Sequence, residues 1–200
     1  MNTRGDESGA GKRIPTVVTF LEMQGRAPVL APLPKGKIAI LRAERPPVHF
    51  YRYLYDTIGR DYHWVDRKKV ADDTLETILQ DPKVELYVLH AEGCPAGMAE
   101  LDFRKENVCN LAYFGLMPEF IGCRLGPWLL DAAIDSAFRT EPKRIFVHTC
   151  TFDHPKALGL YQRAGFRVYD QRATAFPDPR RTGILPRTLR HPRLPRLPDT

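Results

Sequence analysis

The chain has 200 residues, of which 43% are hydrophobic and 10% aromatic, enough to bury one core of ordinary size. No run approaches the ~20 apolar residues of a membrane-spanning helix, and the polar opening MNTRGDESGAGKR lacks the apolar centre of a secretory signal. These features predict one globular, cytoplasmic domain with no membrane partner.

The basic excess is concentrated near the C-terminal end. The formal net charge is +6, and residues 177–200 contain six arginines against two aspartates, a net charge of +4. A proline- and arginine-rich segment is typical of a flexible, solvated tail, and a nucleic-acid or membrane tether is the alternative. Nucleic acid is therefore expected as a partner only through this tail.

The four cysteines are far apart, with no C-x-x-C pair: Cys94, Cys109, Cys123 and Cys150. This spacing argues against a zinc site and against a compact disulfide framework, so we expect reduced thiols and no metal. A thiol nucleophile at Cys123 or Cys150 is an alternative, but no companion His–Asn arrangement can be read from the sequence.

The first part of the chain contains two strands and two helices. TVVTFLEM (16–23) and KIAILRAE (37–44) have the β-branched and apolar content of strands, and 26–36 carries three prolines typical of a linker or a wrapping segment. Apolar residues at three-to-four spacing predict helices over 48–59 and 72–80.

The second part of the chain alternates more regularly. Its predicted elements are strands at 84–91, 97–104 and 108–117, a helix at 128–138, a strand at 143–152, a helix at 157–164 that Asp153 caps, and a strand at 166–176. An interior glycine, Gly115, indicates a bulge or a close backbone approach. The order predicts an α/β fold with a mixed, mostly antiparallel sheet flanked by helices on both faces.

Residues 118–130, PEFIGCRLGPWLL, place two glycines before an apolar helix. Amide N–H groups at a helix N-terminus lack partners within the helix and, together with the helix dipole, attract anions such as pyrophosphate. Pro127 agrees with a helix start, because proline is favoured at the first helical position. The stretch fits a phosphate-binding turn, with ordinary strand–helix packing as the alternative.

Two longer strings carry a family resemblance: FGLMPEF-IGCRLG-PWLLDAA, and then RIFVHTCTFDHPKALGLYQRAGFRVY. Their order resembles the GNAT superfamily of acyl-CoA-dependent N-acetyltransferases over 84–175, and more loosely over 37–83. The resemblance implies a single-domain GNAT-like fold at 37–176. A polar N-terminal segment, strand and Pro-rich linker (1–36) and the flexible tail (177–200) lie outside it.

The resemblance implies a coenzyme A pyrophosphate loop. The family pattern Q/R-x-x-G-x-G/A falls on 121–126, where Ile121 replaces Gln or Arg, Arg124 replaces the first glycine and Gly126 matches. If position 124 needs a positive φ, arginine costs on the order of 1 kcal/mol, which charge-assisted hydrogen bonds to phosphate would partly offset. We expect coenzyme binding that is retained but weakened. The expected binding residues are Gly122, Cys123, Arg124, Leu125, Gly126 and Pro127.

The resemblance also implies roles around the thioester. In the family the pantetheine arm pairs with backbone groups that fall here at Phe114, Leu116 and Met117, and one such amide can stabilise the oxyanion. Tyr161 matches the tyrosine that protonates the departing thiolate, with a core tyrosine as the alternative. His154 stands where the family often has a coenzyme-contacting asparagine; it either donates in its place or helps to start the helix.

The general base is less clearly indicated. The family often has a glutamate where Asn110 falls here, and an amide cannot act as a base. Glu100 on the neighbouring strand is the remaining candidate for removing the amine proton, with a solvated surface carboxylate as the alternative. His63 and Trp64 are candidates for lining the acceptor pocket, with packing as the alternative.

The implied activity is transfer of an acetyl group from acetyl-CoA to a primary amine in a ternary complex, with no metal and no covalent intermediate. Acceptors range over small amines, amino acids, peptide N-termini and aminoglycosides. The alternative is a non-catalytic module that binds acyl-CoA or docks on a partner or nucleic acid. A homodimer is left open.

Overall fold

The computed structural model describes residues 13–26, 31–62, 64–191, 194 and 197. Its strands are β1 (Arg13–Met23), β2 (Ile38–Ala43), β3 (Val84–Ala91), β4 (Cys94–Asp102), β5 (Val108–Leu116), β6 (Arg144–Cys150) and β7 (Arg167–Pro177). Its helices are α1 (Val48–Gly59), α2 (Asp72–Gln80), α3 (Leu125–Phe138) and α4 (Ala157–Arg163), with 3-10 turns η1 (Arg67–Lys69) and η2 (Pro118–Phe120).

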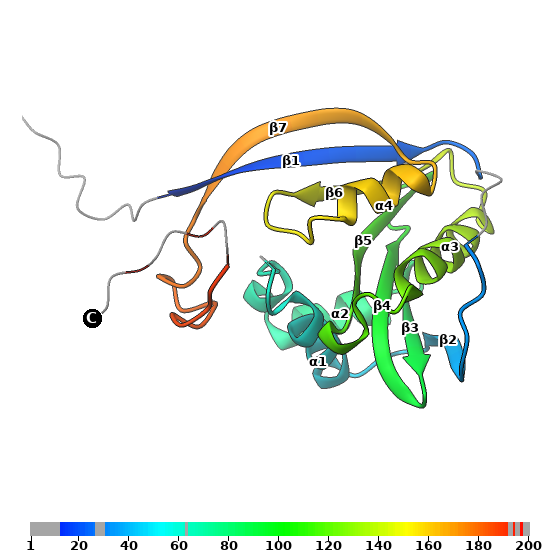
Figure 1. Cartoon of the computed structure of the whole chain (residues 1–200), viewed down its shortest axis with the longest axis horizontal. Helices are drawn as coiled ribbons and strands as arrows, with labels where there is room; N and C mark the ends of the chain where they lie inside the picture. Colours follow the sequence, from blue (N-terminus) through cyan, green and yellow to red (C-terminus); the bar gives the residue numbers. More distant parts are fainter. Residues whose placement is uncertain (1–12, 27–30, 63, 192–193, 195–196, 198–200) are drawn as a thin grey trace, which may run out of the picture.

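The strands form one sheet in the order β2-β3-β4-β5-β6-β1-β7. Neighbouring strands are antiparallel except for β5 and β6, which run parallel. The N-terminal strand β1 lies within the sheet, between β6 and β7, and forms a long ribbon with β7 (Figure 1). The predicted mixed, mostly antiparallel sheet is confirmed.

Helices cover both faces of the sheet because its strands alternate apolar side chains between two cores. Met98 packs with Leu54 of α1 and Leu75 of α2. Its neighbour Ala99 packs with Leu130 of α3, and successive residues of a strand point to opposite faces. α1 and α2 therefore lie on one face, and α3 lies on the other.

The sheet opens between β5 and β6. In the described part of the chain their parallel pairing covers only 108–110 against 144–146, although β5 continues to Leu116 and β6 to Cys150. The two strands diverge beyond this short ladder, so the edge of β5 that faces β6 has no strand partner there. This opening positions the candidate site.

The segment after β1 wraps over α3. Arg26 forms ion pairs with Asp131 at 2.6 Å and with Asp135 at 2.7 Å, and the Ala31 N–H approaches the Asp131 carboxylate at 3.4 Å. Of the two interpretations of 26–36, the structure supports the wrapping segment. Residues 27–30 lie outside the described residues.

The chain after β7 folds back as a series of turns. Arg180 is only 2% exposed and donates to both carboxylate oxygens of Asp178, at 2.9 and 2.6 Å. Leu185 is buried, and Leu194 packs with Ile14 of β1. The described part of the segment predicted as a flexible tail therefore packs against the sheet.

Two predicted helix starts need correction. α3 begins at Leu125, so Pro127 is its third residue. Asp153 does not cap α4, because its carboxylate accepts hydrogen bonds from the Thr149 hydroxyl and the Cys150 N–H at the end of β6.

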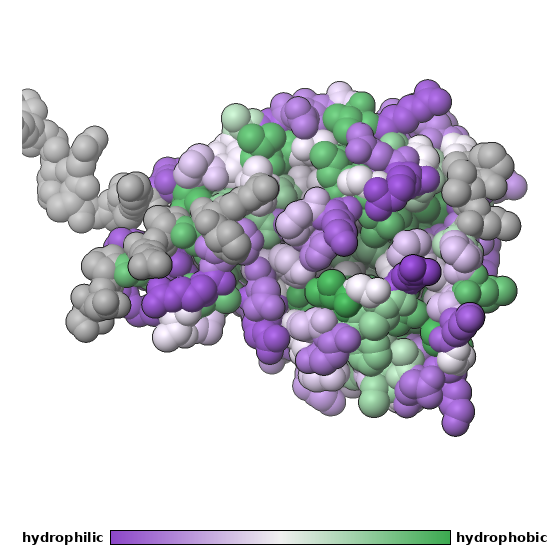
Figure 2. All heavy atoms as spheres, in the orientation of Figure 1, coloured by the Kyte–Doolittle hydropathy of each residue, from purple (hydrophilic) through white to green (hydrophobic). Residues whose placement is uncertain are grey.

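The outer surface is mixed in character. Hydrophilic and apolar residues are interspersed over the face seen in Figure 2. Within the described ranges, none of the helices has the length and apolar content to cross a bilayer.

Candidate active site

A cleft of about 800 Å³ passes through the opening between β5 and β6. One part is lined by the loop before α3 and by α4, and the other part by the α1–α2 connection, β1 and the C-terminal turns. Residues far apart in the sequence therefore share one cavity.

The loop at 121–126 lines the first part of the cleft. Gly122 has φ of 91° with open space around it, and Arg124 adopts a left-handed conformation with φ of 61° and ψ of 18° as the N-terminal cap residue of α3. Position 124 thus has a positive φ, which is the condition under which arginine was expected to be costly there. Because Pro127 is the third helical residue and has no N–H, the free amides at this helix end come from its first two residues, Leu125 and Gly126.

The side chains of this loop differ in their placement. Ile121, Gly122, Arg124, Gly126 and Pro127 line the cleft. The Cys123 side chain is exposed and does not line the cleft, and its N–H donates to the Phe120 carbonyl at 3.3 Å. Leu125 is buried in the core beneath α3, so it can contribute only its backbone.

The exposed edge of β5 carries the predicted pantetheine positions. Phe114 and Leu116 line the cleft. Met117 does not fit its predicted role, because its N–H donates to the Ala96 carbonyl at 2.9 Å and its own carbonyl accepts from Phe120 at 3.0 Å. Both backbone groups of Met117 are therefore engaged.

Gly115 is explained by close packing. Its partner on β4 is Met98, and the register shift lies elsewhere, between Glu100 and Leu101. A Cβ atom at Gly115 would lie 2.5 Å from a methyl group of Ile58, a distance that real contacts do not reach. Glycine therefore lets α1 approach this strand.

Tyr161 of α4 is 5% exposed and lines the cleft beside Phe114, with ring centroids 6.0 Å apart. Burial, and next the charge of Asp153, raise the pKa of the phenol well above its usual value. Tyr161 is therefore protonated at neutral pH, as a proton donor must be.

His154 contributes to the start of α4, and it also lines the cleft. Its Nδ1 accepts the Lys156 N–H at 3.1 Å where α4 begins, which leaves Nε2 to carry the proton. Burial and then the charge of Lys156 lower the pKa of His154, which favours the neutral ring. His154 lines the cleft and contacts the Tyr62 ring of the α1–α2 connection at 6.1 Å.

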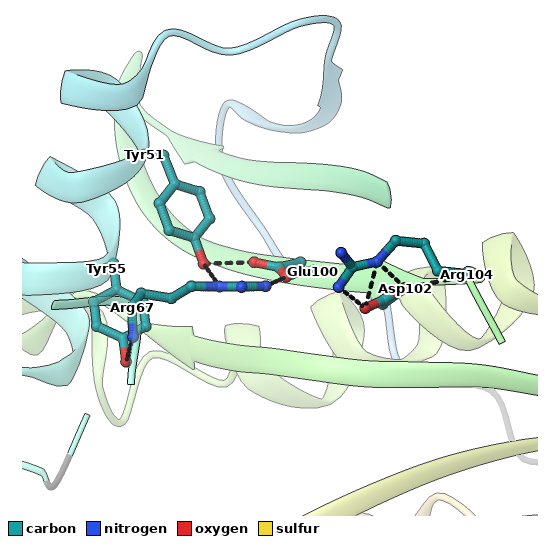
Figure 3. Close-up of polar contacts among 6 residues, drawn as sticks. All are labelled: Tyr51, Tyr55, Arg67, Glu100, Asp102 and Arg104. Carbon is teal, nitrogen blue, oxygen red and sulfur yellow. Dashed lines mark hydrogen bonds and ion pairs between the residues drawn. The ribbon is translucent and has the colours of Figure 1, made fainter. Parts of the chain in front are cut away.

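Glu100 is completely buried, so the alternative of a solvated surface carboxylate is wrong. One carboxylate oxygen accepts the Tyr51 hydroxyl at 2.5 Å, and the other forms an ion pair with Arg67 (Figure 3). Arg67 also places its guanidinium 5.2 Å from the Tyr113 ring centroid, and its backbone N–H donates to the Tyr55 hydroxyl at 3.2 Å. Both Glu100 oxygens are thus engaged in a network that ties the α1–α2 connection to the sheet.

This network was not predicted from the sequence. Arg67 lies in the basic run RKK of η1, whose composition resembles an exposed turn, and nothing local pairs it with Glu100 on β4. Asn110 does not line the cleft, and its buried Oδ1 has no hydrogen-bond partner among the described residues.

Aromatic side chains gather where the α1–α2 connection meets β5. Trp64 lies with its ring centroid 5.2 Å from that of Tyr55 and 5.3 Å from that of Tyr113, and all three line the cleft. Trp64 is thus both packed and part of the cleft wall. The other predicted acceptor-pocket residue, His63, lies outside the described residues.

Cys150 is a poor nucleophile. Cys150 lines the cleft, but burial and the charge of Asp153 raise the pKa of its thiol to about 11. A thiolate is the reactive form of cysteine, so little of it exists here at neutral pH.

Comparison with solved structures finds the same fold. A conserved protein of unknown function from Staphylococcus epidermidis has a TM-score of 0.56 and 13% identity, over 82% of this chain and 62% of that one. GCN5-related N-acetyltransferases from Kribbella flavida and Sphaerobacter thermophilus have TM-scores of 0.56 and 0.57, each with 16% identity. They cover 85% and 82% of this chain, and 59% and 52% of their own. The chain thus spans less than two thirds of the length of these three proteins.

A search among curated proteins found no match. A model of the Acetyltransferase (GNAT) family matches residues 51–166, more than half of the chain. The match includes β5, the loop before α3 and α4, which carry the cleft residues described above. The chain therefore belongs to the Acetyltransferase (GNAT) family.

Proposed function

We propose that the protein transfers an acetyl group from acetyl-CoA directly to a primary amine. The observation that carries the proposal is the phenol of Tyr161, buried and protonated, in a cleft that also holds the N-terminus of α3. Leu125 and Gly126 would offer amides to the coenzyme pyrophosphate, and a charge-assisted hydrogen bond from the Arg124 guanidinium would only offset the cost of that residue's left-handed backbone. Phe114 and Leu116 would pair with the pantetheine arm along the free edge of β5.

In the proposed reaction the neutral amine attacks the thioester carbonyl carbon and the C–S bond breaks. Tyr161 donates its proton to the departing sulfur, and the amine nitrogen releases one proton to solvent or to a base in the cleft. The Tyr161 phenolate then regains a proton from water, so no net proton is lost from the protein. The products are the amide and free coenzyme A thiol. A main-chain N–H on the unpaired edge of β5 would stabilise the oxyanion.

Within this proposal Glu100 acts as a positioning residue. Its two oxygens already accept from Tyr51 and Arg67, and it does not line the cleft. Glu100 thus holds Arg67 against Tyr113 at the cleft wall, in place of the base role expected from the sequence.

The test compares wild type with Tyr161→Phe, measuring thiol release from acetyl-CoA over a panel of primary amines. Removing a general acid should lower kcat roughly 10²- to 10⁴-fold. Coenzyme A binding, measured by calorimetry, should stay within about twofold, because phenylalanine keeps the ring contacts with Phe114 and Phe166. Unchanged turnover would refute the role of Tyr161. Tight coenzyme binding without turnover of any amine would refute transfer and favour a non-catalytic binding module.

A further inference from the structure

The part of the cleft away from α3 is an apolar chamber. It is lined by the α1–α2 connection with β5, by β1, and by β7 with the C-terminal turns. We call this space the apolar chamber. Its lining includes an aromatic wall of Tyr55, Trp64 and Tyr113, a C-terminal wall of Phe176, Pro179 and Ile184, and Val18 of β1.

The aromatic wall is held in place from behind. Tyr55 and Tyr113 meet edge to face at 5.0 Å, and Trp64 contacts both rings. A Cβ atom at Gly59 would lie 2.4 Å from the Trp64 Cβ, so glycine is required for this placement of the indole. The Arg67 guanidinium, paired with Glu100, lies against the Tyr113 ring. The wall is therefore preorganised for a flat or branched apolar group.

The C-terminal wall is held in place by the buried ion pair of the C-terminal turns. The Arg180 side chain donates to both Asp178 oxygens, and its second terminal nitrogen donates to the Leu189 carbonyl at 3.3 Å. The N–H of Ile184 donates to the Pro179 carbonyl at 3.0 Å. Pro179 and Ile184 are therefore presented to the chamber by a closed turn.

Charged groups of the α1–α2 connection that line the cleft are at its solvent-exposed rim. Asp66 and Lys69 lie 3.9 Å apart, with side chains 79% and 52% exposed. They compensate each other and are screened by water. The polar side chains Thr16, Thr174, Thr182 and His148 also line the cleft, and the hydroxyls of Thr16 and Thr182 already have partners in Thr151 and in the Pro179 carbonyl. A second ammonium group or a carboxylate would therefore find its charged partners at the rim, and burial without such partners is costly.

We propose that the acceptor is a primary amine carried on an aromatic or branched apolar body, such as an arylalkylamine. This inference rests on the proposed acetyl transfer. The apolar body lies between the aromatic wall and the C-terminal turns, and the nitrogen points to the opening between β5 and β6. Aromatic faces attract an arriving ammonium, and the apolar surroundings then lower its pKa, which favours the neutral nucleophile.

The first measurement compares 2-phenylethylamine with ethanolamine as acceptors of acetyl-CoA. Both are primary amines on a two-carbon chain, so they differ mainly in the group that would enter the chamber. We expect kcat/KM on the order of 10- to 100-fold higher for 2-phenylethylamine. Ile184→Asp should remove most of this preference, and Leu41→Asp, a change at an exposed residue of β2, should keep it. Equal or reversed preference would overturn the inference and leave acetyl transfer standing.

The second measurement needs no turnover. Of the two tryptophans, Trp64 lines the chamber and Trp128 belongs to α3. The tryptophan fluorescence of a Trp128→Phe variant therefore comes from Trp64 alone. With coenzyme A present, 2-phenylethylamine should change the Trp64 emission at a concentration at least tenfold below that needed with ethanolamine, and Ile184→Asp should remove the difference. Trp64→Phe, which reports Trp128, should show little change. Indistinguishable titrations would overturn the inference. Selective binding without thiol release from any amine would refute transfer but uphold the ligand class.

Discussion

Gly126 allows the coenzyme contact to be tested apart from stability. It is the second residue of α3, and an added Cβ would lie 3.7 Å from Leu116 and 3.8 Å from Leu160, ordinary contact distances. The protein itself therefore has room for Gly126→Ala. Glycine costs up to ~1 kcal/mol relative to alanine in a helix interior, so we expect the free energy of unfolding to rise by about 0.5 kcal/mol at this first turn.

The same methyl group would stand where the amides of Leu125 and Gly126 meet a phosphate. Hydrogen bonds to charged groups contribute about 1.5–3 kcal/mol each. Loss of one such bond raises the dissociation constant of coenzyme A roughly 10- to 100-fold. Gly126→Ala should therefore unfold at a slightly higher temperature and yet bind the coenzyme much more weakly.

Calorimetric titration of coenzyme A and urea unfolding measure the two effects separately. Gly159→Ala is the matched control, because Gly159 lies in α4, does not line the cleft, and an added Cβ would meet only the mobile end of Arg163. That variant should keep the wild-type affinity. An unchanged dissociation constant in Gly126→Ala, beside the expected gain in stability, would refute the assignment of this helix end to the pyrophosphate.

Three further changes test other parts of the cleft. Arg124→Gly removes the backbone strain of a left-handed arginine but adds conformational freedom to the unfolded chain, so the free energy of unfolding should change by less than ~1 kcal/mol. The affinity for coenzyme A should stay equal or rise. A tenfold loss of affinity by calorimetry would make Arg124 a principal phosphate ligand. Glu100→Gln leaves the Arg67 guanidinium without its counter-ion, which should cost about 3 kcal/mol in urea unfolding and raise the amine KM more than it lowers kcat; an unchanged KM would contradict the positioning role. Hydrogen bonds from Arg180 lower the pKa of Asp178, so the pair stabilises fully above the unfolded value of about 4 and loses its contribution as pH falls through the lower folded value. In Asp178→Asn this acid-side dependence of unfolding should weaken, and an identical pH curve would contradict the account.

The sheet and its helices were predictable because their patterns are local. Alternation along β3 to β5 and helical spacing in α1 and α2 determine which side of each element is apolar. The same patterns predict the succession of strands and helices along the chain. The helix was predicted over 128–138, three residues later than the start of α3 at Leu125, because proline at position 127 resembles a residue at a helix start. The actual start is a left-handed Arg124, a conformation that sequence pattern does not assign to arginine.

The C-terminal turns show where composition misleads. Arginine and proline content predicts a solvated tail, but burial here depends on pairing Arg180 with Asp178 and on apolar contacts with Ile14 at the other end of the chain. Glu100 and Arg67 pose the same difficulty, since their contact joins β4 to a basic turn 33 residues away. Long-range pairs of this kind leave no periodic signal in one sequence.

The groups near the reaction centre limit how the amine can lose its proton. Glu100 is already bonded through both oxygens, and burial raises the pKa of Tyr113 to about 12, even though the charge of Arg67 acts in the opposite direction. The thiol of Cys150 has a pKa near 11 for a similar reason. A group with so high a pKa is protonated at neutral pH and cannot accept another proton usefully.

The apolar chamber offers a different route, because removing water from an ammonium group lowers its pKa. The chamber itself then supplies neutral amine, and the proton leaves before the nitrogen reaches the thioester. If so, the pH at which kcat/KM rises should depend on the pKa of the acceptor amine. For 2-phenylethylamine and a fluorinated analogue of lower pKa, the two rises should be separated along the pH axis by the difference between the pKa values of the two amines. A rise of kcat/KM at the same pH for both amines would instead identify a base on the protein. His148, whose exposed imidazole lines the cleft, is then the residue to replace first.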